Sequence, residues 1–253
     1  MKIWTVYMST KKVTEQSHKK TTSKDRRESL RLETLEYGRK AYMKGDFDQA
    51  MNTWLPLAEN GDVEAQAWVG SLYANGDGVK IDPSVAFQWY LRSAKGGNPQ
   101  AQANVGALYA MGQGVGQDMA EAVRWIRRAA RNGDANAQFN MAVLYTKGDG
   151  VKQNPTKAAE WYRKGAENGH HQSQGRLGHM YHVGDGVKKD RVEAYLWLSL
   201  ASQHGIGSAL TELEKVIGEM SSDEKAAGMK LVEMWRSQHG SSGGSAVFTP
   251  LPE

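Results

Sequence analysis

Residues 65–97 read AQAWVGSLYANGDGVKIDPSVAFQWYLRSAKGG, and residues 101–133 read AQANVGALYAMGQGVGQDMAEAVRWIRRAARNG. The second stretch copies the first at a spacing of 36 residues, and two further copies follow. Aromatic residues mark this spacing through all four copies: Trp89, Trp125, Trp161 and Trp197, and likewise Tyr73, Tyr109, Tyr145 and Tyr181. A spacing kept this strictly predicts tandem copies of one supersecondary unit.

Each copy carries the signals of two helices. Val69, Leu72 and Tyr73 lie on one face of a first helix at helical spacing. A Gly-x-Gly-Val loop ends that helix, because glycine readily adopts the left-handed backbone of a helix terminus. The second helix follows an N-cap residue in every copy: Asp82, Asp118, Asn154 and Asp190. One hairpin cannot bury its own apolar face, so the sequence predicts an all-α solenoid of stacked 36-residue hairpins.

The pattern changes at both ends of the chain. A shorter hairpin is predicted at residues 33–60, and a helix near Leu210–Glu219 precedes a capping box of Ser221 and Glu224. Composition predicts a basic disordered tail at 1–28 and a flexible tail at 240–253. The solenoid between them is expected at 29–239, with repeats at about 29–64, 65–100, 101–136, 137–172 and 173–208 and a helical cap at 209–239.

The pattern A-Q-A-x-x-G-x-L-Y-x-x-G-x-G-V-x-x-D, followed by A-x-x-W-Y-x-x-A and G, resembles the Sel-one-like repeat family, a relative of the tetratricopeptide repeats. In the first copy it is carried by Ala65, Gln66, Gly70, Leu72, Tyr73, Gly76, Gly78, Val79, Asp82, Ala86, Trp89, Tyr90, Ala94 and Gly97. The resemblance covers about residues 36–208. It implies a right-handed tetratricopeptide-like superhelix with the first helices along a concave groove. It also implies adaptor or scaffold roles, often in bacteria.

Charge is distributed unevenly along the chain. The formal net charge is +4, but residues 1–28 alone carry eight Lys and Arg against three acids, so the remainder is slightly negative. A nucleic-acid partner for the folded body is therefore not expected. No apolar run reaches the roughly 20 residues of a membrane helix, and residues 1–10 lack a secretory apolar core. The chain as written is predicted to be cytoplasmic and monomeric; a misassigned start would allow a periplasmic or secreted protein.

No residue pattern indicates catalysis. The glycine-rich loops follow helices and lack nucleotide-binding spacing, and there is no cysteine. Five of the seven histidines fall within residues 170–204, and His179 and His182 share a face of one first helix. A zinc site would need a third and a fourth ligand, for which His171 and Glu167 are the candidates, but there is no H-E-x-x-H motif and no orienting carboxylate is evident for these histidines. We therefore expect no catalytic residue, no metal site and no cofactor.

The candidate site is the groove lined by the first helices. Trp68 replaces a position that is polar in the other copies, which predicts an exposed aromatic anchor for a partner. The Trp and Tyr of the 36-residue pattern are instead predicted to fill the space between helices. Helical spacing places the following residues in the groove: Trp68, Ser71, Asn75, Asn104, Met111, Asn140, Lys147, Arg176, His179 and His182.

These features favour a non-enzymatic scaffold that binds a protein segment in the groove. Two alternatives remain open. The cysteine-rich branch of the family that the chain resembles suggests a cell-wall or β-lactam-related binder or hydrolase. No Ser-x-x-Lys pair stands in a suitable setting in this chain, however. The basic residues 1–28 could also contact an acidic partner, nucleic acid or lipid headgroups, with strong salt dependence as the sign of nucleic-acid binding.

Overall fold

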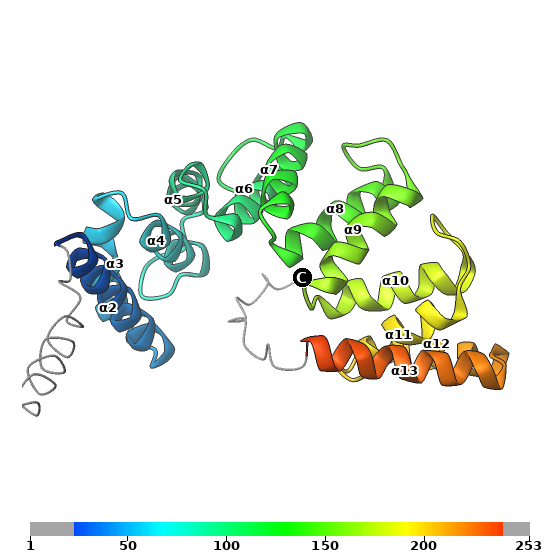
Figure 1. The fold of residues 1–253 in the computed structure, drawn as a ribbon. Coiled ribbons are helices and arrows are strands. Elements are labelled where there is room, and N and C mark those ends of the chain that lie inside the picture. Colours follow the sequence, from blue (N-terminus) through cyan, green and yellow to red (C-terminus); the bar gives the residue numbers. More distant parts are fainter. Residues whose placement is uncertain (1–22, 240–253) are drawn as a thin grey trace, which may run out of the picture. The chain divides into compact units, whose positions relative to one another are not determined.

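The computed structural model describes residues 23–239 of the chain, and this range forms twelve helices and no strand, which confirms the all-α prediction. Figure 1 shows them in chain order as α2 (Ser23–Met43), α3 (Phe47–Glu59), α4 (Val63–Asn75), α5 (Pro83–Lys95), α6 (Pro99–Met111), α7 (Met119–Arg131), α8 (Ala135–Lys147), α9 (Pro155–Glu167), α10 (His171–Val183), α11 (Arg191–Ser202), α12 (Gly207–Glu219) and α13 (Ser222–His239).

The chain divides into two compact units, and the boundary falls between Ile81 and Asp82. The first unit contains α2, α3 and α4, and the second contains α5 to α13. Within the second unit, α6 packs with α7, α8 with α9, and α10 with α11. We call α6, α8 and α10 the A helices, and α5, α7 and α9 the B helices. The predicted tails at 1–22 and 240–253 lie outside the described residues.

One predicted boundary is wrong. Helix α2 begins at Ser23, so residues 23–28 belong to a helix and not to a disordered tail. Two ion pairs hold this part of the helix: the Arg31 guanidinium lies 2.8 Å from Glu28 and 2.9 Å from Asp62 of the first unit. Asp62 also caps α4, so the contact ties the start of α2 to the next hairpin.

The predicted helix starts and ends are confirmed. The side chains of Asp82, Asp118, Asn154 and Asp190 each accept hydrogen bonds from backbone N–H groups of the helix that follows. Helices α4, α6, α8 and α10 end at left-handed glycines: Gly76, Gly112, Gly148 and Gly184. The last helix starts with the expected capping box, in which Ser221 N–H donates to the Glu224 carboxylate at 2.8 Å and Glu224 N–H donates to Ser221 Oγ at 3.2 Å.

The second glycine of each loop lets neighbouring hairpins approach. Gly114 and Gly186 lie against the backbone of Pro83 and Pro155, at the start of the B helix one repeat earlier, and a Cβ on either glycine would collide with the proline carbonyl oxygen. Both glycines also have positive φ, 70° and 68°. These two loops therefore set how closely consecutive repeats stack; in the loop between them, Gly150 instead lies against the Val123 side chain and the Met119 carbonyl of α7.

A buried glutamine joins the two helices across each repeat boundary. Gln102 and Gln138 donate from Nε2 to the carbonyls of Ala94 and Ala130, each at 3.1 Å, and Gln66 and Gln174 make the equivalent bond. The carboxamide oxygen of Gln138 is also bonded, because Asn168 Nδ2 donates to Gln138 Oε1 at 2.9 Å. Within residues 23–239, every buried side-chain nitrogen and oxygen has a hydrogen-bond partner.

Candidate partner-binding surface

The A helices carry seven of the predicted groove residues, and all seven lie in the second unit. Each A helix buries its Ala, Gln and aliphatic face against the neighbouring helices, and the opposite face remains partly or fully open to solvent. We call the following residues the A-helix surface: Asn104, Met111, Asn140, Lys147, Arg176, His179 and His182. Met111, Lys147, Arg176 and His179 are exposed, and Asn104, Asn140 and His182 are half-buried. Asn104, Asn140 and Arg176 occupy equivalent positions in consecutive repeats.

The predicted groove residues of the first unit do not form an open surface. Ser71 is buried, and Asn75 is exposed, with its Nδ2 bonded to Asp77 at 3.1 Å. Trp68 is half-buried, because its ring stacks on Trp54 with 4.6 Å between centroids and an angle of 18° between planes. The Tyr42 ring also packs against Trp68, with 5.6 Å between the two ring centroids. The prediction that Trp68 is exposed is therefore wrong, since the terminal hairpin supplies aromatic rings that pack against it.

His179 and His182 share a carboxylate at the end of the A-helix surface. Glu212 of α12 accepts from His179 Nδ1 at 2.6 Å and from His182 Nδ1 at 3.0 Å. Glu219, two turns further along α12, lies 3.2 Å from His182 Nε2. Arg191 extends the network, with Nε 3.4 Å from Glu219 and Nη1 3.5 Å from Glu224. The network joins α10, α11, α12 and α13.

This network corrects the prediction that the histidines have no orienting carboxylate. Burial raises the pKa of Glu212, but hydrogen bonds from His182 and His179 outweigh burial and the net pKa is lowered. The hydrogen bond from His182 likewise lowers the pKa of Glu219. The 36-residue pattern does not predict either glutamate, because α12 lies outside it. The signal available was a helix with two acids seven residues apart, which places them on one face.

The His–Glu pairs lack the other parts of a hydrolytic site. Within residues 23–239, no hydroxyl group hydrogen-bonds to His179 or His182. The same range contains no group of three or more His, Cys, Asp or Glu arranged to hold a metal ion. A nucleophile next to its base is the usual requirement for covalent catalysis. The geometry gives these histidines a structural role in fixing α12 against α10.

Arg176 and Lys147 are the cations of the A-helix surface whose N–H donors are available to a partner. Both are exposed, and neither forms a hydrogen bond or ion pair with another residue of 23–239. An arginine guanidinium presents several donors in a planar fork that suits a carboxylate. The Asn104 and Asn140 carboxamides at the equivalent positions can each donate and accept. The A-helix surface can therefore bind the backbone amides of a partner segment together with an acidic side chain of that segment.

His170 has a role that its place in the histidine cluster did not predict. It stands where α4, α6 and α8 have Asp62, Asn98 and Asp134, and its Nδ1 accepts a hydrogen bond from Ser173 N–H at 3.1 Å. The repeat spacing predicts this N-cap role, because position 170 is 36 residues after Asp134. The ring also packs against Phe139, with 4.7 Å between centroids. The cap requires a neutral imidazole, since Nδ1 must accept.

The pKa of His170 is lowered to about 4, first because burial disfavours the imidazolium and second because of repulsion from His171. An unfolded histidine titrates near pH ~6.5, so between that pH and about 4 only the unfolded chain gains this proton. Stability is therefore complete above pH ~6.5 and falls as the pH decreases, by about 2 kcal/mol at pH 4 once partial solvent exposure is allowed for. His170→Asn keeps the cap and removes the titrating group.

We expect urea titrations at pH 7.5 and pH 4.5 to show a smaller loss of stability in His170→Asn than in the wild type, by about 1–2 kcal/mol. At pH 7.5 the two proteins should have similar stability, because both caps accept a hydrogen bond there. An equal loss of stability in both proteins would contradict the lowered pKa, because it would mean that folded His170 is already protonated at pH 4.5.

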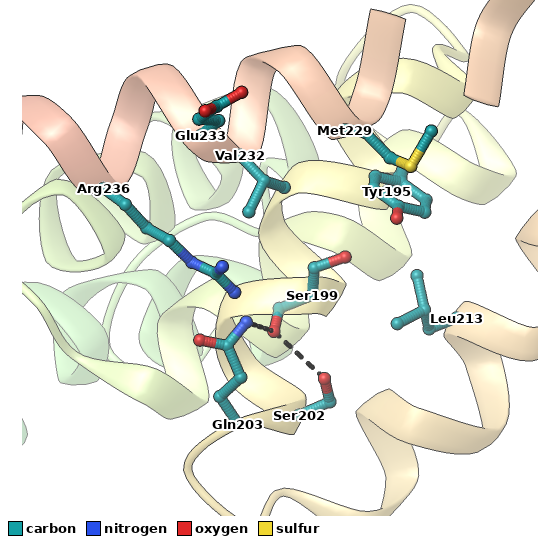
Figure 2. Close-up of a pocket in the computed structure, with 9 residues that line it drawn as sticks. All are labelled: Tyr195, Ser199, Ser202, Gln203, Leu213, Met229, Val232, Glu233 and Arg236. Atoms are coloured by element: carbon teal, nitrogen blue, oxygen red, sulfur yellow. Dashed lines mark hydrogen bonds between the residues drawn. The ribbon is translucent and has the colours of Figure 1, made fainter. Parts of the chain in front are cut away.

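A hollow of about 440 Å³ opens at the C-terminal end of the second unit. Helices α12 and α13 both pack on α11 but hardly on each other, so a space remains between them. Figure 2 shows Tyr195, Leu213 and Met229 at one side of the hollow and Arg236 with Gln203 at the other. The Gln203 side chain donates to the Ser199 carbonyl at 2.9 Å. This hollow is a second candidate site, with apolar and cationic parts side by side.

The stacked hairpins with recurring caps, loops and buried glutamines define an all-α repeat solenoid. The chain belongs to the Sel1 repeat family, whose pattern matches residues 63–98, 99–134, 135–170 and 171–206. Each matched segment starts two residues before the predicted repeat, at the first residue of α4, α6, α8 or α10. The Sel-one-like resemblance is thereby confirmed.

Two crystal structures are similar to the chain. A Sel1 repeat protein from Oxalobacter formigenes shares 31% identity, with 83% of this chain and 86% of that protein covered and a TM-score of 0.66. The protein c5321, a protective antigen of uropathogenic Escherichia coli with an SLR fold, shares 27% identity at a TM-score of 0.71. That comparison covers 91% of this chain and 52% of c5321, so the chain spans about half of that antigen. No curated protein matches the chain.

Sel1 repeat proteins are generally protein-interaction scaffolds. Within residues 23–239, no helix is both long enough and apolar enough to cross a membrane.

Proposed function

We propose that this protein is a non-enzymatic scaffold that binds an extended or helical segment of a partner protein along the A-helix surface. The observation that supports the proposal most strongly is the row of equivalent polar positions Asn104, Asn140 and Arg176 on consecutive A helices. A row of this kind suits a partner that runs across several repeats, because each repeat offers one polar contact at a constant spacing.

The chemistry of the row suggests how the partner is held. The two carboxamides pair with the backbone of the partner, which fixes its position along the row. Arg176 and Lys147 then favour carboxylates on the partner, and hydrogen bonds to charged groups are the stronger ones. Met111 adds an exposed apolar contact at the end of α6. Trp68 is left out of this proposal, since it packs within the first unit.

The alternative of a cell-wall or β-lactam-related hydrolase receives no support from the site. His182 bonds through both ring nitrogens to Glu212 and Glu219, His179 bonds through Nδ1 to Glu212, and no nucleophile accompanies them within the described residues. A chromogenic β-lactam incubated with the pure protein tests this alternative. Turnover that disappears in His179→Ala would restore it.

Asn140→Ala/Arg176→Ala should weaken binding of any partner held on this surface by tenfold or more, because two polar anchors are lost at once. Partners are first identified by affinity capture from the host with the wild-type chain. Each is then purified and titrated against the wild type and the variant.

The matched control is Lys225→Ala/Lys230→Ala, which removes two polar side chains from α13 on another part of the second unit. Its affinity should stay within about twofold of the wild type. Partners that bind the Asn140→Ala/Arg176→Ala protein as tightly as the wild type would contradict the A-helix surface as the binding site.

A further inference from the structure

The B helices carry a concentration of positive charge that the net charge of the chain does not reveal. Helices α5, α7 and α9 together hold nine Lys and Arg against Glu121, Glu160 and Glu167. Their basic residues are Arg92, Lys95, Arg124, Arg127, Arg128, Arg131, Lys157, Arg163 and Lys164. Seven of the nine are exposed, and Arg127 and Arg163 are half-buried. This basic B-helix surface belongs wholly to the second unit and is separate from the A-helix surface.

Helix α7 forms the centre of the basic B-helix surface. Its four arginines stand at 124, 127, 128 and 131, a spacing that places all of them on one helix face. Arg124 pairs with Glu121 at 2.7 Å. Within residues 23–239, the other three form no ion pair. Three cations on two turns of helix repel one another, so a local anion would stabilise the arrangement.

The cations are held in place by the tryptophans of the repeat. Arg92 lies over Trp89 at 4.6 Å, Arg128 over Trp125 at 5.6 Å, and Lys164 over Trp161 at 4.4 Å from the ring centroid. Trp125 is buried, and Trp89 and Trp161 are half-buried, so each indole contributes to the core on one side and carries a cation on the other. A stacked guanidinium keeps its N–H edges available for a carboxylate. The recurring tryptophans thus position one cation per repeat.

A shallow hollow of about 350 Å³ lies beside this surface. Its walls are α9 and the loop after α10, with Ala159 and Val187 as apolar lining, and it is also lined by two cations, Arg163 and Lys164, and two acids, Glu160 and Glu167. An apolar side chain of a partner fits such a space, and its carboxylates are best placed on the neighbouring arginines of α7, because Glu160 and Glu167 offset Arg163 and Lys164 in the hollow itself. The combination is that of an interface anchor next to charged contacts.

We propose that the basic B-helix surface is a second docking site, which binds an acidic protein segment with an apolar residue among its carboxylates. The three glutamates interrupt the row of cations, and a peptide can place uncharged residues opposite them, whereas a continuous phosphate backbone would carry a charge past each one. The cations also form separate clusters, one per repeat, which suits separate carboxylates. The slightly negative charge of residues 29–253 supplies no broad positive field for a polyanion.

The test is fluorescence anisotropy with the full chain and a fluorescein-labelled 16-residue peptide of Glu and Asp around a central Leu. We expect Arg127→Gln/Arg131→Gln to weaken binding at least tenfold at low salt, and wild-type binding to weaken as salt increases. Arg127→Lys/Arg131→Lys retains the charge and should stay within about threefold of the wild type.

The control Lys225→Gln/Lys230→Gln changes the net charge equally but lies on α13, and it should bind within twofold of the wild type. An equal loss in this control would overturn the proposal, because the effect would then depend on net charge alone. Tighter binding of single-stranded DNA or of phosphatidylglycerol vesicles, lost in Arg127→Gln/Arg131→Gln, would overturn the acidic segment as the occupant. Absence of peptide binding to the wild type would overturn the site itself. Circular dichroism of each variant verifies that it is folded.

Discussion

Gly186→Ala should lower the free energy of unfolding of the second unit by about 4 kcal/mol, although it adds a single methyl group. The new Cβ would collide with the Pro155 carbonyl oxygen at the start of α9. That oxygen belongs to a helix backbone, so it cannot move aside as a flexible side chain can. The positive φ of 68° adds a further cost, because residues other than glycine are strained there. The loop and α9 must separate, and the contact between consecutive repeats weakens.

Gly133→Ala is the matched control for this prediction. Gly133 has a φ of 91°, and a Cβ built on it meets nothing within 4 Å. This variant therefore carries only the backbone cost, which we expect to be about 1 kcal/mol. Urea unfolding followed by circular dichroism measures both variants. If Gly186→Ala and Gly133→Ala lose equal stability, the close contact between the loop and the preceding B helix does not limit the stacking of repeats.

Trp54→Ala should cost the first unit about 4 kcal/mol. Trp54 has no exposed surface, and its Nε1 donates to the Leu35 carbonyl at 3.2 Å. Its ring fills the space left by Gly38 and stacks on Trp68. Removal of the ring leaves a large cavity and deprives Trp68 of its stacking partner. The α2–α3 hairpin should then unfold at a lower urea concentration than in the wild type.

Trp68→Ala is the comparison for Trp54→Ala, and it should cost about 2 kcal/mol because the Trp68 ring is only half-buried. The same expectation affects binding experiments. A loss of partner binding in Trp68→Ala would reflect damage to the first unit as well as any lost contact, so Asn140 and Arg176 are better probes of the A-helix surface. Equal stability of Trp68→Ala and the wild type would contradict the stacking role of this ring.

The histidine residues show where reasoning from the sequence succeeds and where it stops. Helical spacing correctly placed His179 and His182 on one face of α10, because that relation depends on three residues of local backbone. Their partners Glu212 and Glu219 come from a helix more than 30 residues away, which does not follow the repeat. Without the pattern, no spacing rule relates α12 to α10. His170 is the intermediate case, since its capping role follows from the repeat once Asp62, Asn98 and Asp134 are recognised as caps.

Residue types and their spacing are enough to predict the repeat length, the all-α class, the N-caps of the second helices, the left-handed glycines and the final capping box. All of these features depend on contacts within a few residues or on a spacing copied from one repeat to the next. Residue types in order along the chain indicate local contacts and repeat spacing alike. Three features follow only from the packing of the helices: Trp68 stacks on Trp54, α12 supplies Glu212 to the histidines, and Trp89, Trp125 and Trp161 each carry a cation. Burial and pairing depend on which side chains neighbouring elements bring into contact, and at the ends of a repeat array those neighbours no longer follow the repeat.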